Sequence, residues 1–164
     1  MVPPEGIRGN RPRLRGDTVL KPRAAAPPAK KKTVLFVCIG NSCRSQMAEG
    51  FARAYGADIV IARSAGLSPA TIIAPLTRQV MQERNVRLDG HFPKPLNLVA
   101  NESFDLIVNM SGHPFAMPNA RAARVIDWPV PDPIGEKEEV YRSVAGRIEA
   151  LVMRLILDLR AGVA

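Results

Sequence analysis

The residues that could carry chemistry lie close together between positions 38 and 45. Cys38 follows a continuous apolar run at 34–37, and Arg44 and Ser45 follow after five intervening residues. A helical pattern begins at once, so the cysteine stands in a loop between a strand end and a helix start. Such a loop offers backbone N–H donors and the positive end of a helix dipole to a tetrahedral oxyanion, and the same field favours the thiolate. The pattern predicts that Cys38 attacks a phosphorus or arsenic centre.

The neighbours of Cys38 fit a cradle for an oxyanion. Gly40 and Asn41 tolerate the positive φ angles that a tight loop needs. The guanidinium of Arg44 can bind two oxygens of an anion at once. A cation at the first turn opposes the helix dipole, and binding of an anion explains why Arg44 stands there. Ser45 is expected to cap the helix and to donate a hydrogen bond to the thiolate. The loop residues expected to surround the ion are Ile39, Gly40, Asn41, Ser42, Cys43 and Ser45.

Two further residues have a functional and a structural interpretation. Asp132 lies in a rigid Pro-flanked loop, where it could protonate a leaving group and later activate water, or simply form an Asp-Pro turn. Cys43 could capture an oxidised Cys38 as a reversible disulfide, or only pack within the loop. Asn41 is expected to brace the loop. Phe92 and Phe115 are expected in the core, with aromatic contacts to the substrate as the alternative.

The elements that must position these residues alternate between strand and helix. The pattern predicts βαβ units and a mostly parallel sheet with ligands bound beyond the carboxyl ends of its strands. A turn is expected at 64–66, between the second strand and second helix. The predicted strands span 33–38, 58–62, 104–110 and 124–127, and the predicted helices span 45–55, 75–84 and 136–160, the last with an apolar stripe of Val140, Val144, Ile148, Leu151, Val152, Leu155 and Leu159.

Charge divides the chain into two parts. Of the 164 residues, the first 32 hold nine Lys/Arg against two acidic residues, whereas residues 33–164 hold fourteen against thirteen. The net charge of +8 therefore describes an appendage and not the globular part. We interpret residues 1–32 as a basic, Pro-rich, disordered leader and residues 33–164 as one catalytic domain. An arm for nucleic acid is the alternative interpretation of the leader, but we do not expect nucleic-acid contact.

Cysteine content and hydropathy restrict the class of protein. The two cysteines cannot form a disulfide framework, and His91 and His113 lie too far from them in sequence to suggest a zinc site, so no metal and no cofactor are expected. No apolar run reaches the roughly 18 residues of a membrane helix. We therefore expect a cytoplasmic enzyme, because a reducing compartment suits a catalytic thiol.

The motif VCIGNSCRS at 37–45 resembles the C-x5-R-S signature of the low-molecular-weight protein tyrosine phosphatases, and PDP at 131–133 resembles their general-acid loop. The resemblance covers about 33–160, with the two motifs about 90 residues apart and in the family's order. It implies a flavodoxin-like three-layer α/β sandwich with a four-stranded parallel sheet. By this similarity Cys38 is the nucleophile, Arg44 binds the oxyanion, Ser45 assists the thiolate and Asp132 is the acid, so that phosphate monoesters are hydrolysed through a phosphocysteine.

Other segments resemble the arsenate reductase branch of the same superfamily. Gln46 stands where the phosphatases usually carry proline, and SAGLSP at 64–69 and the segment 74–94 are similar to that branch. The thioredoxin-coupled reductases use two further cysteines after the third strand, but this chain has Met110, Ser111 and Gly112 there. The alternative function is therefore an arsenate reductase that uses an external thiol, of the glutathione or mycothiol type, with a glutaredoxin-like partner.

Overall fold

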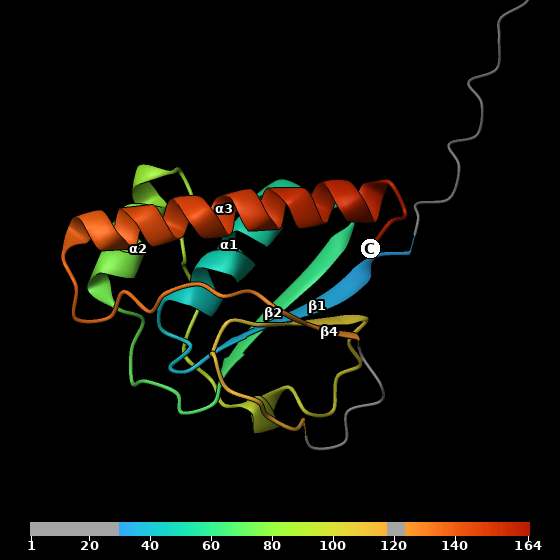
Figure 1. Ribbon diagram of the computed structural model, residues 1–164, viewed down its shortest axis with the longest axis horizontal. Helices are drawn as coiled ribbons and strands as arrows, with labels where there is room; N and C mark the ends of the chain where they lie inside the picture. Colours follow the sequence, from blue (N-terminus) through green and yellow to red (C-terminus); the bar gives the residue numbers. More distant parts are fainter. Residues whose placement is uncertain (1–29, 118–123) are drawn as a thin grey trace, which may run out of the picture.

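The computed structural model describes residues 30–117 and 124–164, which form an α/β fold around one parallel sheet (Figure 1). The strands are β1 (Lys32–Cys38), β2 (Val60–Gly66), β3 (Leu106–Asn109) and β4 (Arg124–Asp127), in the order β2-β1-β3-β4. The helices are α1 (Arg44–Gly56), α2 (Pro75–Glu83) and α3 (Glu138–Arg160), with a short 3-10 helix η1 (Leu96–Leu98). The predicted fold class is confirmed.

The predicted domain boundary falls at the start of the sheet. β1 begins at Lys32, one residue before the predicted start of the domain at position 33. Most of the predicted leader, residues 1–29, lies outside the described residues. Apart from β2, the predicted elements agree with the observed ones to within two residues at each end.

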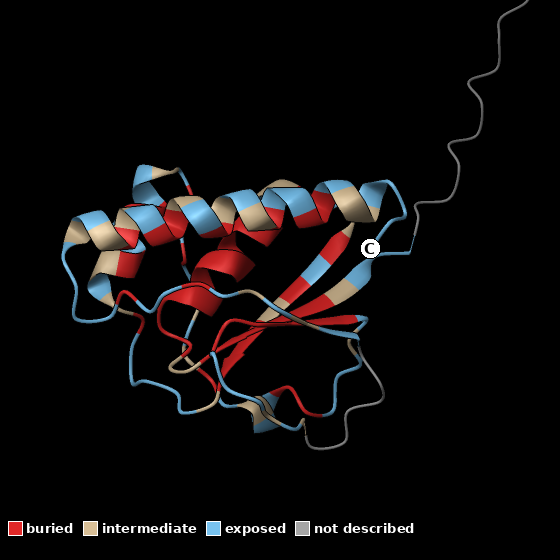
Figure 2. Cartoon of the chain, viewed as in Figure 1, coloured by how far each residue is buried: buried red, intermediate tan, exposed pale blue. Residues whose placement is uncertain are grey.

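The central strand β1 feeds two hydrophobic cores. Val34, Phe36 and Cys38 point into the core beneath the helices, whereas Leu35 and Val37 point into a smaller core on the opposite face. Four of them, all but Cys38, are fully buried, and Figure 2 shows the interior of the sheet as buried. Successive side chains of a strand alternate between faces, so an uninterrupted apolar run is what a strand covered on both sides requires.

The two faces of the sheet are covered differently. Helices α1, α2 and α3 lie over one face, and η1 with the neighbouring loops covers the other (Figure 1). The predicted apolar stripe of α3 faces the larger core: Val144, Ile148, Val152 and Leu155 are buried, and Val140, Leu151 and Leu159 are partly buried. Each fully buried aliphatic side chain of this kind contributes about 1.5–3 kcal/mol.

The second strand runs further than the sequence predicts. We expected strand 58–62 and a turn at Ser64-Ala65-Gly66, but β2 includes these three residues, which pair with Phe36–Cys38 of β1. Pairing with β1 overrides the local turn preference of small residues. The small size has another use: a Cβ on Gly66 would lie 2.7 Å from the carbonyl oxygen of Ile39. Gly66 thus lets β2 end directly against the loop after β1.

The strand order places a crevice beside Cys38. From β1 the chain passes to β2 on one side of the sheet and then to β3 on the other side of β1. The connections diverge at the carboxyl ends of β1 and β3, where open α/β sheets bind their ligands. Cys38 ends β1 and Asn109 ends β3, so both border this position.

Candidate active site

The loop 39–43, the Cys38 loop, is fixed by hydrogen bonds that its carbonyl groups accept from the segment after β2. Four backbone N–H groups of the segment after β2 donate to carbonyls of Cys38 and this loop: Leu67 to Cys38 (3.1 Å), Ser68 to Ile39 (2.8 Å), Ala70 to Gly40 (2.9 Å) and Ala74 to Ser42 (3.1 Å). The N–H and C=O of a trans peptide point in opposite directions. The N–H groups of the same four peptides, those of Ile39, Gly40, Asn41 and Cys43, therefore point away from that segment and toward the inside of the loop.

The thiol of Cys38 contacts the hydroxyl of Ser45. The two atoms, Sγ and Oγ, are 2.9 Å apart, and both side chains are buried. Asn41 Nδ2 donates to the same hydroxyl at 2.7 Å. Because that bond occupies Ser45 Oγ as an acceptor, the hydroxyl proton is free to point at the sulfur and stabilise a thiolate.

Asn41 braces the Cys38 loop. It adopts a left-handed conformation, with φ of 48°. Its side-chain oxygen accepts hydrogen bonds from Gln46 Nε2 at 3.1 Å and from the backbone N–H of Lys94 at 3.0 Å. These bonds fix the orientation of the amide, so its Nδ2 must face Ser45.

The prediction that Ser45 caps the helix is wrong. The residue before α1 is Cys43, no side chain caps this helix end, and Ser45 lies within α1.

Arg44 joins the Cys38 loop to two segments that are distant in sequence. It is 4% exposed, and its Nη1 donates to the carbonyl oxygens of Met110 and of Val130, the latter at 3.1 Å. Its Nη2 lies 3.4 Å from Oδ2 of Asp132, whose Oδ1 accepts the N–H of Ile134 at 3.1 Å. The guanidinium is thus fixed by backbone oxygens at one end and faces the exposed carboxylate of Asp132 at the other.

A cavity of about 190 Å³ brings the predicted reactive groups together. It is lined by Cys38, Ile39, Gly40, Ser42, Cys43, Arg44, Ala70, Asp132 and Ile134. Asn41 and Ser45 do not line it and act from behind the loop. No aromatic side chain of the described residues lines this cavity. Phe92 is 54% exposed elsewhere, so its expected place in the core is wrong, whereas Phe115 is half-buried against the smaller core.

Cys43 is a buried thiol at the edge of this cavity. Both cysteines are free, and burial raises the pKa of Cys43 to about 12. At neutral pH the group is therefore a protonated thiol, which is a weak nucleophile. A role for Cys43 as redox partner of Cys38 stays a prediction, and this raised pKa works against it.

A polar network behind the Cys38 loop was missed by reasoning from sequence. Gln46 Oε1 lies 2.9 Å from His91 Nδ1, and Gln46 Nε2 donates to the carbonyl oxygen of Phe92 at 3.1 Å. Glu49 is 3% exposed and accepts a hydrogen bond from Ser64 at 2.6 Å. Burial lowers the pKa of His91, so the neutral ring donates to Gln46. The sequence feature that could have indicated this network is the pair Gln46 and Glu49, two polar residues three positions apart in an otherwise apolar part of the helix.

The described part of the chain holds no group of three or more His, Cys, Asp or Glu side chains that could bind a metal ion. Among the same residues, no helix combines the length and apolar character that crossing a membrane requires.

Comparisons with known proteins agree on one family. Residues 33–164 match the family described as low molecular weight phosphotyrosine protein phosphatase. A glutaredoxin arsenate reductase of Synechocystis sp. is 35% identical over 127 residues, which cover 76% of this chain and 96% of that protein.

Solved structures have the same architecture. An arsenate reductase in the phosphate binding state is 33% identical, with a TM-score of 0.68 over 78% of this chain and 98% of the other. The YwlE arginine phosphatase from Geobacillus stearothermophilus superposes with a TM-score of 0.66 over 80% and 94% of the two chains. At 24% identity the second likeness concerns the fold alone.

Proposed function

The chain belongs to the low molecular weight phosphotyrosine protein phosphatase family, and from this premise we propose that it reduces arsenate at Cys38 with electrons from an external thiol. The relatives named arsenate reductases, matched over nearly their whole length, support this reaction. These relatives favour arsenate reduction, which is the alternative function drawn from the sequence. They give less support to the hydrolysis of phosphate monoesters, which is the first function predicted from the sequence.

The cavity at Cys38 suits a small tetrahedral ion. Its volume is about 190 Å³, and the inward N–H groups of the Cys38 loop and the guanidinium of Arg44 offer donors to oxygens on several sides. Its outer wall includes Ala70 and Ile134. A phosphotyrosine ring would find no aromatic partner among the described lining residues, which removes about 0.5–1.5 kcal/mol per stacked pair.

The first step forms a bond between Cys38 and arsenic. The thiolate, which accepts a hydrogen bond from Ser45, attacks As(V), and an arsenate hydroxyl takes up a proton from solvent and leaves as water. The adduct carries a Cys38 Sγ–As bond, and arsenic is not yet reduced. Arg44 and the loop N–H groups hold the remaining oxygens during this exchange.

The second step transfers the electrons. An external thiolate attacks Cys38 Sγ, the S–As bond breaks, and its electron pair goes to arsenic, which leaves as arsenite. A mixed disulfide between Cys38 and the external thiol remains. A second external thiol then attacks this disulfide, releases the oxidised thiol pair and restores Cys38. One arsenate and two thiols thus give one arsenite, one disulfide and one water.

The cysteine content is the observation that supports an external reductant. The chain has only Cys38 and Cys43, and the second is buried with its pKa raised to about 12. No internal thiol is therefore ready to attack the adduct at neutral pH. The name of the Synechocystis relative includes glutaredoxin, and we propose that a glutaredoxin-type protein with a small thiol reduces the mixed disulfide.

The decisive assay measures arsenite formed by the purified chain with arsenate, glutathione or mycothiol, and the matching redoxin. We expect arsenite, together with a mixed disulfide at Cys38 detectable by peptide mass when the redoxin is omitted. Cys38→Ser should form neither. Hydrolysis of p-nitrophenyl phosphate without any arsenite, with every thiol tried, would reject the reductase proposal.

Phosphate-monoester hydrolysis remains the second candidate, because of Asp132. Its carboxylate lines the cavity 3.4 Å from Arg44, where a general acid could reach a leaving group. This reaction would pass through a phosphocysteine that water hydrolyses. Rapid-quench trapping of a phosphate adduct at Cys38, with turnover in the absence of thiols, would support it.

A further inference from the structure

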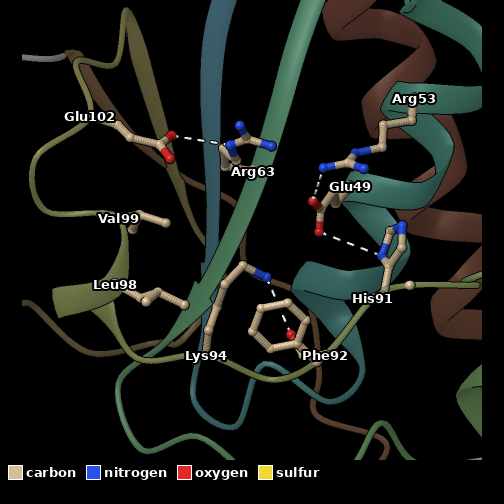
Figure 3. A pocket seen from close by; sticks show the side chains of 10 residues that line it. Glu49, Arg53, Arg63, His91, Phe92, Lys94, Leu98, Val99 and Glu102 are labelled. Carbon is tan, nitrogen blue, oxygen red and sulfur yellow. Dashed lines mark hydrogen bonds and ion pairs between the residues drawn. The ribbon is translucent and has the colours of Figure 1, made fainter.

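A second cavity, of about 310 Å³, lies at the edge of the sheet formed by β2 (Figure 3). It is bordered by α1, by β2 and by the segment 90–102, and it shares no lining residue with the cavity at Cys38. A volume of this size is at the lower end of the range for small-molecule sites, roughly 300–1,000 Å³.

The charged side chains around this cavity leave one positive charge in excess. The buried Glu49 pairs with Arg53 at 2.7 Å, and Glu102 pairs with Arg63 at 3.1 Å. Lys94 is the remaining cation, and within the described residues it forms no ion pair. The cavity therefore suits an anion of single charge better than a dianion or a metal ion.

Lys94 is the least satisfied of these groups. The residue is 8% exposed, and its Nζ donates to the carbonyl oxygen of Phe92 at 3.3 Å and lies 5.0 Å from the centre of the Phe92 ring. An ammonium has three donors, and among the described residues only the carbonyl oxygen of Phe92 accepts from this one. Burial lowers the pKa of Lys94, because it disfavours the charged form. An anion beside Nζ would remove this penalty.

An apolar wall adjoins the ammonium. Phe92 is 54% exposed and Leu98 is 58% exposed, which is high for large apolar side chains, and Val99 is buried beside them. In Figure 3, Leu98 and Val99 lie on the side opposite Glu49, with Lys94 and Phe92 between them. A ligand with an apolar body would cover this wall.

The segment that carries Phe92 and Lys94 is held in place before any ligand arrives. The N–H of Gly66 donates to the carbonyl oxygen of Lys94 at 2.8 Å, and the N–H of Lys94 donates to Asn41 Oδ1 at 3.0 Å. Gln46 holds the carbonyl of Phe92 at 3.1 Å. A site fixed in this way loses little entropy when it binds.

We propose that this cavity binds a small organic monocarboxylate, with its carboxylate at Lys94 Nζ and its apolar body against Phe92 and Leu98. The assignment does not depend on the reaction at Cys38.

The test uses the full chain and amide shifts in NMR titrations with benzoate, its neutral analogue benzamide, and inorganic phosphate. Benzoate should shift the amides of Phe92, Lys94 and Val99 in a saturable way and bind roughly tenfold or more tightly than benzamide. Phosphate should shift the Cys38 loop and with it the amide of Lys94, which donates to Asn41, but it should leave the amide of Val99 in place. Equal binding of benzamide, a saturable shift of the Val99 amide by phosphate, or benzoate shifts confined to the Cys38 loop would overturn the proposal.

Variants separate the charge from the apolar wall. Lys94→Met should weaken benzoate binding about tenfold or more, whereas the exposed control Lys137→Met should leave it unchanged. If Lys94→Met does not fold, Phe92→Ala decides, because its ring is exposed and its loss should also weaken benzoate binding. Unchanged affinity in a folded Lys94→Met, or in Phe92→Ala, would contradict the assignment.

Discussion

Ser45→Ala tests the hydrogen-bond arrangement behind Cys38. The hydroxyl of Ser45 is shared between Cys38 Sγ, at 2.9 Å, and Asn41 Nδ2, at 2.7 Å. Removing it takes one donor from the thiolate and one acceptor from a fully buried amide. The variant should therefore lose both reactivity and stability, by amounts that can be measured separately.

The two losses follow from ordinary hydrogen-bond energies. A bond to a charged group contributes about 1.5–3 kcal/mol, so its loss should reduce the ratio of thiolate to thiol roughly ten- to 150-fold, and alkylation at neutral pH should slow with the thiolate population. Leaving the buried amide of Asn41 without an acceptor costs about 1–3 kcal/mol of folding free energy. A mutation that only created a small void would lower the stability without reducing the alkylation rate of Cys38 to this extent.

The assay is alkylation by iodoacetamide at neutral pH, with the modification assigned to Cys38 by peptide mass, alongside unfolding in urea. Ser143→Ala, an exposed serine of α3, is the matched control and should behave as wild type. If Ser45→Ala is alkylated at the wild-type rate, Ser45 does not donate to the sulfur and the arrangement inferred from Asn41 is refuted.

Three further changes test other parts of the structure. Gly66→Ala would place its Cβ 2.7 Å from a backbone oxygen of the Cys38 loop, so urea unfolding should show a loss of about 1–3 kcal/mol; Gly146→Ala, which meets only a flexible arginine end, should not, and equal effects would contradict the reasoning. The lowered pKa of His91 means that the unfolded chain takes up this proton first, so stability should fall as the pH drops below His91's ordinary value of 6.5. His91→Asn should remove that decline, which sets in well above the range where carboxylates titrate, and an unchanged pH profile would argue against a neutral buried His91. Asp132→Asn should slow phosphatase turnover of poor leaving groups up to about 10²–10⁴-fold, and equal losses for good leaving groups would exclude a general-acid role.

Some features could be predicted from the sequence because neighbouring residues produce them. The apolar run of β1 is continuous and the apolar stripe of α3 repeats about every 3.6 residues, and in the structure the first is a strand buried on both faces and the second a buried helix face. The Cys38 loop lies between a strand and a helix that are adjacent in sequence. Its place at the end of β1 therefore follows from the local pattern together with the parallel sheet.

Other features depend on pairing between distant segments. β2 extends to Gly66 because its last residues pair with β1, although Ser64-Ala65-Gly66 alone predicts a turn. Phe92 was expected in the core because it is large and apolar, but it is exposed beside the second cavity. No local pattern shows which apolar side chain a neighbouring segment leaves uncovered.

The sequence by itself determined the place of Cys38 at a strand end, the loop that follows it and the order of the elements around them, because these follow from residues within a few positions of one another. Only the tertiary structure decided the partners of those groups. The carbonyls of Met110 and Val130 that hold Arg44 are 66 and 86 residues away from it, and the loop of Asp132 lies as far. Such contacts depend on the strand order and register of the sheet, which place segments that are far apart in sequence beside one another at the carboxyl ends of the strands.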